Sequence, residues 1–177
     1  MKYDPDVHHR QSMRLPGYDY SDPGAYFVTI CTQNRECLLG QIIGDKMQLN
    51  KWGEVAHEEW FRSQQIRYEI RLDPNEFVVM PNHIHGIVCI CEDHVVGATG
   101  RSPLPTHVSN PRGPISRSLG AFIAGFKSAV TKQINQLRGR PGIPVWQRNY
   151  FEHIIRNENE LSRIREYIIS NPSNWRT

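Results

Sequence analysis

A short apolar segment that contains two histidines places the strongest constraint on how this chain can fold. Residues Met80–Val88 read MPNHIHGIV, and apolar residues surround His83 and His85. On a strand, successive side chains point to opposite faces, so both imidazoles would lie on one face, about 7 Å apart along it, with Ile84 on the other. Two such imidazoles can share one cation. A pair of surface histidines without a metal gives the same pattern, so the motif alone leaves both interpretations open.

Further apolar runs predict the other strands of a sheet. Runs bounded by turn residues predict strands over residues 26–32, 37–43, 69–80 and 84–91. Between the second and the third of these strands we expect a helix that begins after Asn50, whose side chain can cap it. Its apolar stripe, at helical spacing, consists of Trp52, Val55, Ala56 and Trp60. These tryptophans are most simply core residues.

The second half of the chain is expected to be mainly helical. It should contain, in order, a helix over residues 116–137, a short strand over residues 145–147 and a short helix over residues 148–156. Asn157, with Glu160 three residues later, resembles a capping box that opens a last helix, which should end before Pro172. The order of elements indicates an α+β fold, in which helices pack on an antiparallel or mixed sheet.

Length and composition limit the class of protein. A chain of 177 residues is long enough for one domain, so we expect a single domain over residues 1–177, with a C-terminal helix and tail over 157–177. The sequence has no apolar run that would span a membrane and no signal peptide, which predicts a cytoplasmic protein. The four cysteines lack the spacing of paired zinc hooks and are expected to be buried thiols.

Positive charge is concentrated in one part of the chain. No Asp or Glu occurs from His94 to Phe151, whereas the rest of the chain has 13 basic and 18 acidic residues. Such asymmetry favours a polyanionic partner such as nucleic acid, although a solvated basic face has the same composition. The candidate DNA-binding residues are Arg101, Arg112, Arg117, Lys127, Lys132, Arg138, Arg140 and Arg148. Residues 92–115, rich in Gly and Pro, are expected to form a long flexible loop within this region.

The segment around Tyr150 supplies the candidate nucleophile. If residues 148–156 are helical, Tyr150 and His153 lie on one face, because residues three apart are neighbours on a helix. A tyrosine beside a histidine that binds a metal suits covalent catalysis. A tyrosine that only packs with its hydroxyl at the surface would have the same sequence.

Several motifs together resemble one family of enzymes. Over nearly its whole length the chain resembles the single-tyrosine HUH transposases (His-hydrophobic-His), and most closely the REP-associated tyrosine transposases of bacteria. The matching segments are 14–20 (RLPGYDY), Met80–Val88, 126–128 (FKS), 148–156 (RNYFEHIIR), 165–168 (REYI) and Asn171-Pro172. The resemblance implies a ferredoxin-like or RRM-like antiparallel sheet with the two histidines on a central strand. It also implies a helix that brings a tyrosine over them.

The resemblance further implies a reaction and its site residues. It implies that Tyr150 attacks a phosphodiester of single-stranded DNA at a palindromic hairpin, leaving a 5′-phosphotyrosine and a free 3′-hydroxyl. Mg²⁺ or Mn²⁺ would be the cofactor, with His83, His85 and His153 as ligands. His153 is assigned because Ile154 stands where some members have a ligating glutamine. The family pattern implies a monomer rather than a dimer. Among the aromatic residues, Tyr18, Tyr20 and Trp175 are candidates for stacking on unpaired bases, although packing within the fold accounts for each of them equally well.

Two other functions remain open from the sequence. A metal-dependent phosphohydrolase of the histidine-triad kind would need a third histidine at the position of Ile87. A module that binds DNA or RNA hairpins without catalysis would keep the sheet but would not need His83, His85 and a tyrosine. A covalent adduct with DNA would distinguish the transposase from both.

Overall fold

A five-stranded antiparallel sheet is the centre of the molecule. The computed structural model describes residues 17–92 and 114–175. The strand order is β4-β6-β1-β7, and β5 also pairs with β6. The bounds of these strands are β1 (Gly24–Cys31), β4 (Ile70–Arg71), β5 (Phe77–Met80), β6 (His83–Ile90) and β7 (Phe151–Ile155). Strand β6 is therefore central and carries both histidines, as the sequence predicted.

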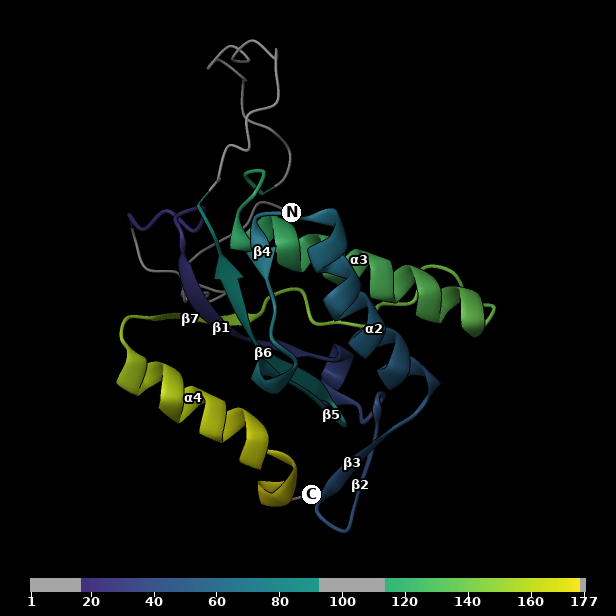
Figure 1. The fold of residues 1–177 in the computed structure, drawn as a ribbon. Helices are drawn as coiled ribbons and strands as arrows, with labels where there is room; N and C mark the ends of the chain where they lie inside the picture. The colour runs from purple at the N-terminus through teal and green to yellow at the C-terminus, as the bar shows by residue number, and fades with distance from the viewer. Residues whose placement is uncertain (1–16, 93–113, 176–177) are drawn as a thin grey trace, which may run out of the picture.

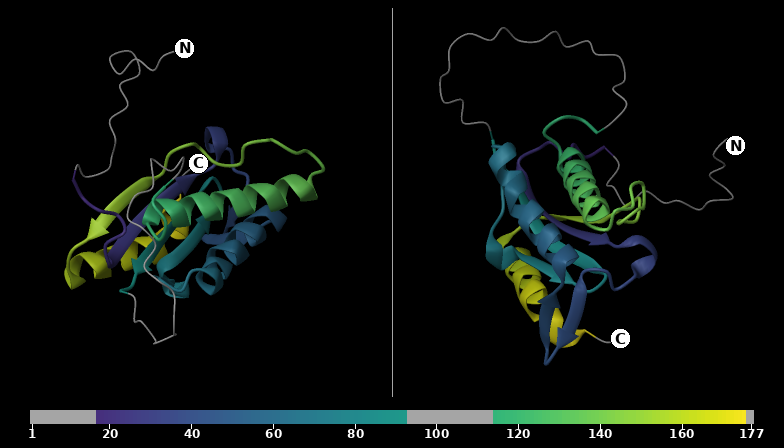
Figure 2. Two further views of the ribbon diagram at one scale, coloured as in Figure 1. Left: turned by 90° about the horizontal axis from the view of Figure 1, so that it is seen from above. Right: turned by 90° about the vertical axis from the view of Figure 1, so that its right-hand side faces the viewer.

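Helices cover both faces of this sheet (Figures 1 and 2). Helices α2 (Lys51–Ile66) and α3 (Leu119–Leu137) pack on one face, and α4 (Glu158–Ser170) packs on the other. A separate hairpin joins β2 (Gly40–Ile43) to β3 (Lys46–Leu49). Three short 3-10 turns complete the elements of the described residues, at η1 (Gln33–Arg35), η2 (Pro74–Glu76) and η3 (Pro172–Asn174). No helix in the described ranges is long and apolar enough to cross a membrane. The α+β fold class is confirmed.

The larger core lies between the sheet and the pair α2 and α3. Trp60 is fully buried there and stacks on Phe77, with ring centroids 4.6 Å apart, while Phe122 meets its edge at 5.1 Å. Gly86 makes this approach possible, because a Cβ atom at that position would lie 2.5 Å from the Trp60 ring. The two predicted tryptophans differ, since Trp52 is only partly buried and packs against the edge of this core.

A smaller core lies under α4, on the opposite face. It consists of Phe27, Ile87 and Ile168, with Leu161 and Ile164 packed against it. This smaller cluster leaves part of the sheet face accessible, and the histidines of β6 lie on that face.

Side-chain caps define where the helices begin. Asn50 accepts hydrogen bonds from the backbone N–H groups of Trp52 and Gly53, and Asn157 accepts one from Glu160. Both caps were predicted from the sequence and are confirmed. In a capping box, the Glu160 side chain would accept from the backbone N–H of Asn157. Here it accepts from the backbone N–H of Arg156, one residue earlier.

Several expected elements differ from the structure. The expected helix over residues 148–156 is wrong, because residues 151–155 form β7 on the open edge of β1. The expected strand over residues 69–80 is two strands separated by η2, β3 was not predicted, and residues 145–147 contribute only an isolated bridge from Trp146 to Thr32. For β7 and β3, pairing with a neighbouring strand, which local periodicity does not contain, decided the conformation. The expected flexible loop over 92–115 falls largely on residues 93–113, outside the described residues.

Candidate active site

The side chains of His83 and His85 approach each other at their Nε2 atoms. The Nε2 atoms of His83 and His85 are 2.9 Å apart, and the rings lie at 74° to each other. Alternation on β6 places both side chains on the α4 face, where they oppose Cys31 and Thr29 of β1. The single-face placement predicted from the sequence is thus confirmed.

Each imidazole is oriented by a partner at its inner nitrogen. His83 Nδ1 is 2.7 Å from Asn82 Oδ1, and the Asn82 amide nitrogen in turn donates to the carbonyl of Arg35. This second bond places the amide oxygen toward His83, so His83 Nδ1 donates and its Nε2 keeps a lone pair. His85 Nδ1 is 2.8 Å from the Thr29 hydroxyl. Partners of this kind fix the ring orientation of histidines that bind metals.

Burial keeps both histidines neutral at physiological pH. It lowers the pKa of His83 to about 4, with a smaller contribution from Arg35, and that of His85 to about 3, with a smaller contribution from His83. Neutral imidazoles with outward lone pairs are the form that binds a cation.

The geometry of the two nitrogens fits a shared divalent cation. Two nitrogens bound at roughly 2.0–2.1 Å and at right angles around one ion are about 2.9 Å apart. Without a positive charge or a proton between them, two lone pairs would face each other at this distance. The described residues contain no group of three or more His, Cys, Asp and Glu side chains arranged for a metal. Phosphate oxygens, water and phenol oxygens are hard ligands that would add to the coordination of such an ion.

Tyr167 of α4 completes this centre. Its hydroxyl is 3.2 Å from His85 Nε2, and its ring centroid is 5.1 Å from the His85 ring. The neighbouring Ile168 is buried in the smaller core, and Arg165 donates from Nε to buried Glu76 at 2.7 Å. These contacts fix α4 on the sheet on either side of Tyr167, whose own side chain remains half exposed. The arrangement places a phenol oxygen beside His85 Nε2, which itself lies 2.9 Å from His83 Nε2.

Tyr150, the nucleophile expected from the sequence, lies elsewhere. Phe151 opposes Thr29 and faces the histidines, and the preceding Tyr150 packs with the core under α2 and α3, on the other face. Lys127 lies over its ring, 5.5 Å from the centroid. The expected meeting of Tyr150 with the histidines is wrong, because the segment alternates as a strand with period two instead of turning as a helix.

His153, the expected third ligand, shares the face of the pair but not its site. It opposes Phe27, one step further along the sheet, and its Nε2 lies 2.7 Å from Glu160 Oε1. The structure therefore pairs His153 with the first turn of α4, and does not group it with His83 and His85.

The sequence pattern of the last helix could have identified Tyr167 as a site residue, although Tyr150 was chosen as the nucleophile instead. The predicted cap at Asn157 opens a helix in which Leu161, Ile164 and Ile168 face the sheet. Tyr167 follows Ile164 by three residues and therefore lies near the same face. It also belongs to the segment REYI, already part of the family resemblance.

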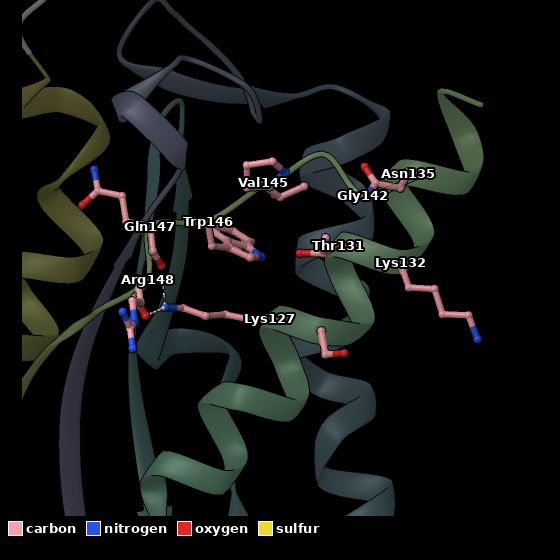
Figure 3. Close-up of a pocket in the computed structure, with 11 residues that line it drawn as sticks. Lys127, Thr131, Lys132, Asn135, Gly142, Val145, Trp146, Gln147 and Arg148 are labelled. Atoms are coloured by element: carbon pink, nitrogen blue, oxygen red, sulfur yellow. Dashed lines mark hydrogen bonds between the residues drawn. The ribbon is translucent and has the colours of Figure 1, made fainter. Parts of the chain in front are cut away.

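The described basic candidates gather on the far side of the sheet from the histidines. Figure 3 shows Lys127, Lys132 and Arg148 around a cavity of about 520 Å³ between α3 and residues 142–148. Lys127 turns inward and donates to the carbonyls of Gln147, Arg148 and Asn149 at 2.9, 3.3 and 3.0 Å. Its ammonium group thus fixes the segment that leads into β7. Lys132 and Arg148 are exposed.

The remaining basic candidates divide into three groups. Arg117 lies over the ring of Tyr68, 4.8 Å from the centroid, and Arg138 donates to Asn135. Arg140 is exposed at the end of α3. Arg101 and Arg112 lie outside the described residues.

The structure also locates the three aromatic residues that were expected to stack on bases, and the four cysteines. Tyr18 and Tyr20 pack on each other and on Tyr26 in the larger core. Trp175 lies beside the site, with its ring 5.8 Å from that of His83. All four cysteines are free, and none of them is buried: Cys37 is exposed and the other three are partly exposed, so the expectation of buried thiols is wrong.

Comparison with known proteins places the chain in a family. A protein of Haemophilus influenzae whose function is uncharacterized is 41% identical over 177 residues, covering 98% of this chain and 94% of that protein. The chain belongs to the family of this protein. No family model matches it.

The chain was also compared with solved structures. A REP-associated tyrosine transposase bound to a REP hairpin superposes with a TM-score of 0.54 and 19% identity, covering 90% of this chain and 72% of that chain. A candidate transposase of Deinococcus radiodurans R1 aligns with a TM-score of 0.47 and 18% identity, over 90% of this chain and 96% of that one. The first comparison shows that this chain has the fold of a REP-associated tyrosine transposase, as the sequence motifs predicted.

Proposed function

We propose that this protein cleaves and rejoins single-stranded DNA beside a hairpin, with Tyr167 as the nucleophile and with a divalent cation held by His83 and His85. The observation that carries the proposal is the position of the Tyr167 hydroxyl, 3.2 Å from His85 Nε2, where His85 and His83 present two nitrogens 2.9 Å apart. The fold shared with a transposase that binds a hairpin supports the substrate class.

The reaction balances without an external energy source. The Tyr167 oxygen attacks phosphorus, the bond from phosphorus to the 3′ oxygen breaks, and the proton lost by the phenol is matched by the one gained by the 3′-hydroxyl. A 5′-phosphotyrosine conserves the energy of the broken bond for attack by another 3′ end. A bound Mg²⁺ or Mn²⁺ would act as a Lewis acid on the phosphate and stabilise the leaving oxygen.

The residues of this chain have separate roles in that scheme. Asn82 and Thr29 hold the imidazoles so that both Nε2 atoms point to the same place. The contact between Arg165 and Glu76 holds α4 and therefore positions Tyr167. A free tyrosine, with a pKa near 10, is a weak nucleophile at pH 7, so its placement beside a cation site is what would make it effective.

Trapping the covalent intermediate tests the proposal directly. The purified protein is incubated with a 3′-labelled DNA hairpin with single-stranded flanks, taken from repeats beside its gene, in the presence of Mn²⁺, because the fragment joined through its 5′-phosphate carries the 3′ end. We expect an adduct that survives denaturation, and mass spectrometry should locate the nucleotide on Tyr167. Tyr167→Phe should abolish the adduct, by at least about a thousandfold in rate, as for the loss of other nucleophiles. Tyr150→Phe is the matched control and should retain it.

Two results would contradict the proposal. An adduct on Tyr150, lost in Tyr150→Phe and kept in Tyr167→Phe, would mean that the segment before β7 rearranges during catalysis. Tight hairpin binding without any adduct, across the whole set of repeats, would instead support a binding module without catalysis.

A further inference from the structure

A cavity of about 360 Å³ opens directly beside the proposed centre, between α4 and the strands β1 and β7. Tyr167 lines this cavity, and its hydroxyl contacts His85. Phe27 lines it as well and stacks on the His85 ring at 5.4 Å and 22°. The cavity and the centre therefore share the Tyr167 and Phe27 rings, and a substrate that is bound at one would extend into the other.

The cavity has aromatic walls that are partly exposed. Phe151, on the edge strand β7, is 39% exposed, and Tyr167 is 49% exposed. Their rings lie around Phe27, with centroids 6.3 Å and 6.0 Å from it and interplanar angles of 68° and 83°. Exposed aromatic rings beside a cavity gain free energy when a flat ring covers them, and unpaired nucleobases provide such rings.

The rim of the cavity carries groups that match the edge of a base. Glu160 and Arg163, on one face of α4, line it together with His153. The Glu160 carboxylate receives one hydrogen bond at each oxygen, from His153 and from the Arg156 backbone, so each oxygen keeps a further lone pair. Glu160 can thus accept from an amino or ring N–H group, while exposed Arg163 can donate to a ring nitrogen, carbonyl or phosphate.

We propose that this cavity binds one unpaired nucleobase of the DNA strand, next to the phosphate that is cleaved. The base stacks on Phe151, and its edge faces Glu160 and Arg163. The inference rests on the proposed function for the nature of the strand, and it adds a site that would fix which phosphate reaches Tyr167. Stacking supplies most of the affinity, because every base has a flat face, and the rim adds a preference between bases.

An abasic scan of the single-stranded flanks tests this site by binding alone. Hairpin oligonucleotides that each lack one base are titrated with wild-type protein in EDTA, which prevents cleavage, and fluorescence anisotropy gives each Kd. We expect one flank position at which loss of the base weakens binding about tenfold. In Phe151→Leu, which keeps an apolar side chain without the flat ring, that penalty should fall below about twofold, whereas Phe151→Trp should retain it.

Two further variants separate the site from general effects. Tyr68→Leu removes another exposed aromatic ring, outside the cavity, and should keep the full penalty at the same flank position, whatever it does to overall affinity through Arg117. Arg163→Gln alters an exposed helix position and cannot disturb the core. It should weaken binding about two- to threefold when the base is present, and less when it is absent, as for other single rim contacts. This variant keeps the test decisive if Phe151→Leu proves unstable in thermal denaturation.

The outcomes distinguish this inference from the proposed function. If no position loses more than twofold, or if the full penalty persists in Phe151→Leu and Arg163→Gln, the cavity does not hold a base. A penalty that follows Phe151 in a protein that forms no adduct would support the cavity and overturn the proposed cleavage. Competition by free nucleoside monophosphates, with no position-dependent penalty in the DNA, would show a nucleotide site unrelated to the strand.

Discussion

The two faces of the central strand β6 differ: one is buried in the larger core, and the other carries the two histidines. Ile84, Gly86 and Val88 face α2 and α3 and are buried in the larger core, where Trp60 packs against Gly86. His83 and His85, which alternate with these residues along the strand, face α4, and their Nε2 atoms lie 2.9 Å apart. One face is filled by aromatic packing, whereas the other is covered only in part. Alternation on a single strand thus separates stability from chemistry, and the same core that fixes β6 fixes the distance between the imidazoles.

Substitutions at adjacent positions of β6 should give the largest contrast between the faces. His83→Ala or His85→Ala should reduce cleavage at least about a thousandfold, since a bound cation supplies several kcal/mol of transition-state stabilisation. Neither should greatly change the midpoint of urea unfolding or the affinity for the hairpin. Ile84→Ala should instead lower the free energy of unfolding by about 2–5 kcal/mol, because it opens a cavity in the core.

The contrast is measured by cleavage rates and urea titrations on the same preparations. Cleavage that persists in either histidine variant would remove that residue from the proposed centre. A histidine variant as unstable as Ile84→Ala would show that the α4 face contributes to stability as the other face does.

Thermal unfolding with and without Mn²⁺ should distinguish the histidines on the α4 face that bind the metal from the one that does not. Mn²⁺ at about a hundred times its Kd should stabilise the wild-type protein by roughly 2.7 kcal/mol, visible as a rise in Tm that EDTA reverses. His85→Ala should lose this rise. His153→Ala should keep it, because His153 is bonded to Glu160 and does not lie with the pair. Loss of the rise in His153→Ala would mean that this histidine turns to the metal and that the sequence-based assignment was right.

Substitutions of the basic residues on the α3 side should have smaller effects, on stability for Lys127 and on DNA binding for Lys132. Lys127→Met should lower the free energy of unfolding by about 1–3 kcal/mol, since three carbonyls lose their donor. Lys132→Met, matched in length and charge change, should leave stability unaltered and reduce the salt dependence of hairpin binding by about one unit of slope. Chemical unfolding and binding titrations at several salt concentrations distinguish these effects. An unaltered slope in Lys132→Met would place the DNA on another surface.

The sequence correctly predicted those features that depend only on residues close to one another along the chain. The caps at Asn50 and Asn157 and the placement of His83 and His85 on one face were predictable, because each follows from spacing within one element. The family resemblance added the fold, which the comparison with a solved transposase confirms.

The tertiary structure decided which tyrosine lies beside the histidines. Residues 148–156 have apolar spacing compatible with a helix, but the free edge of β1 converts residues 151–155 into a strand, which turns Tyr150 to the far face. Sheet pairing joins residues more than a hundred positions apart, and no periodicity in the segment itself encodes it. The position of Tyr167 depends likewise on how α4 packs, through Ile168 and the contact between Arg165 and Glu76. The sequence by itself determined the imidazole pair and the helix that carries Tyr167; only packing across the sheet determined that they meet.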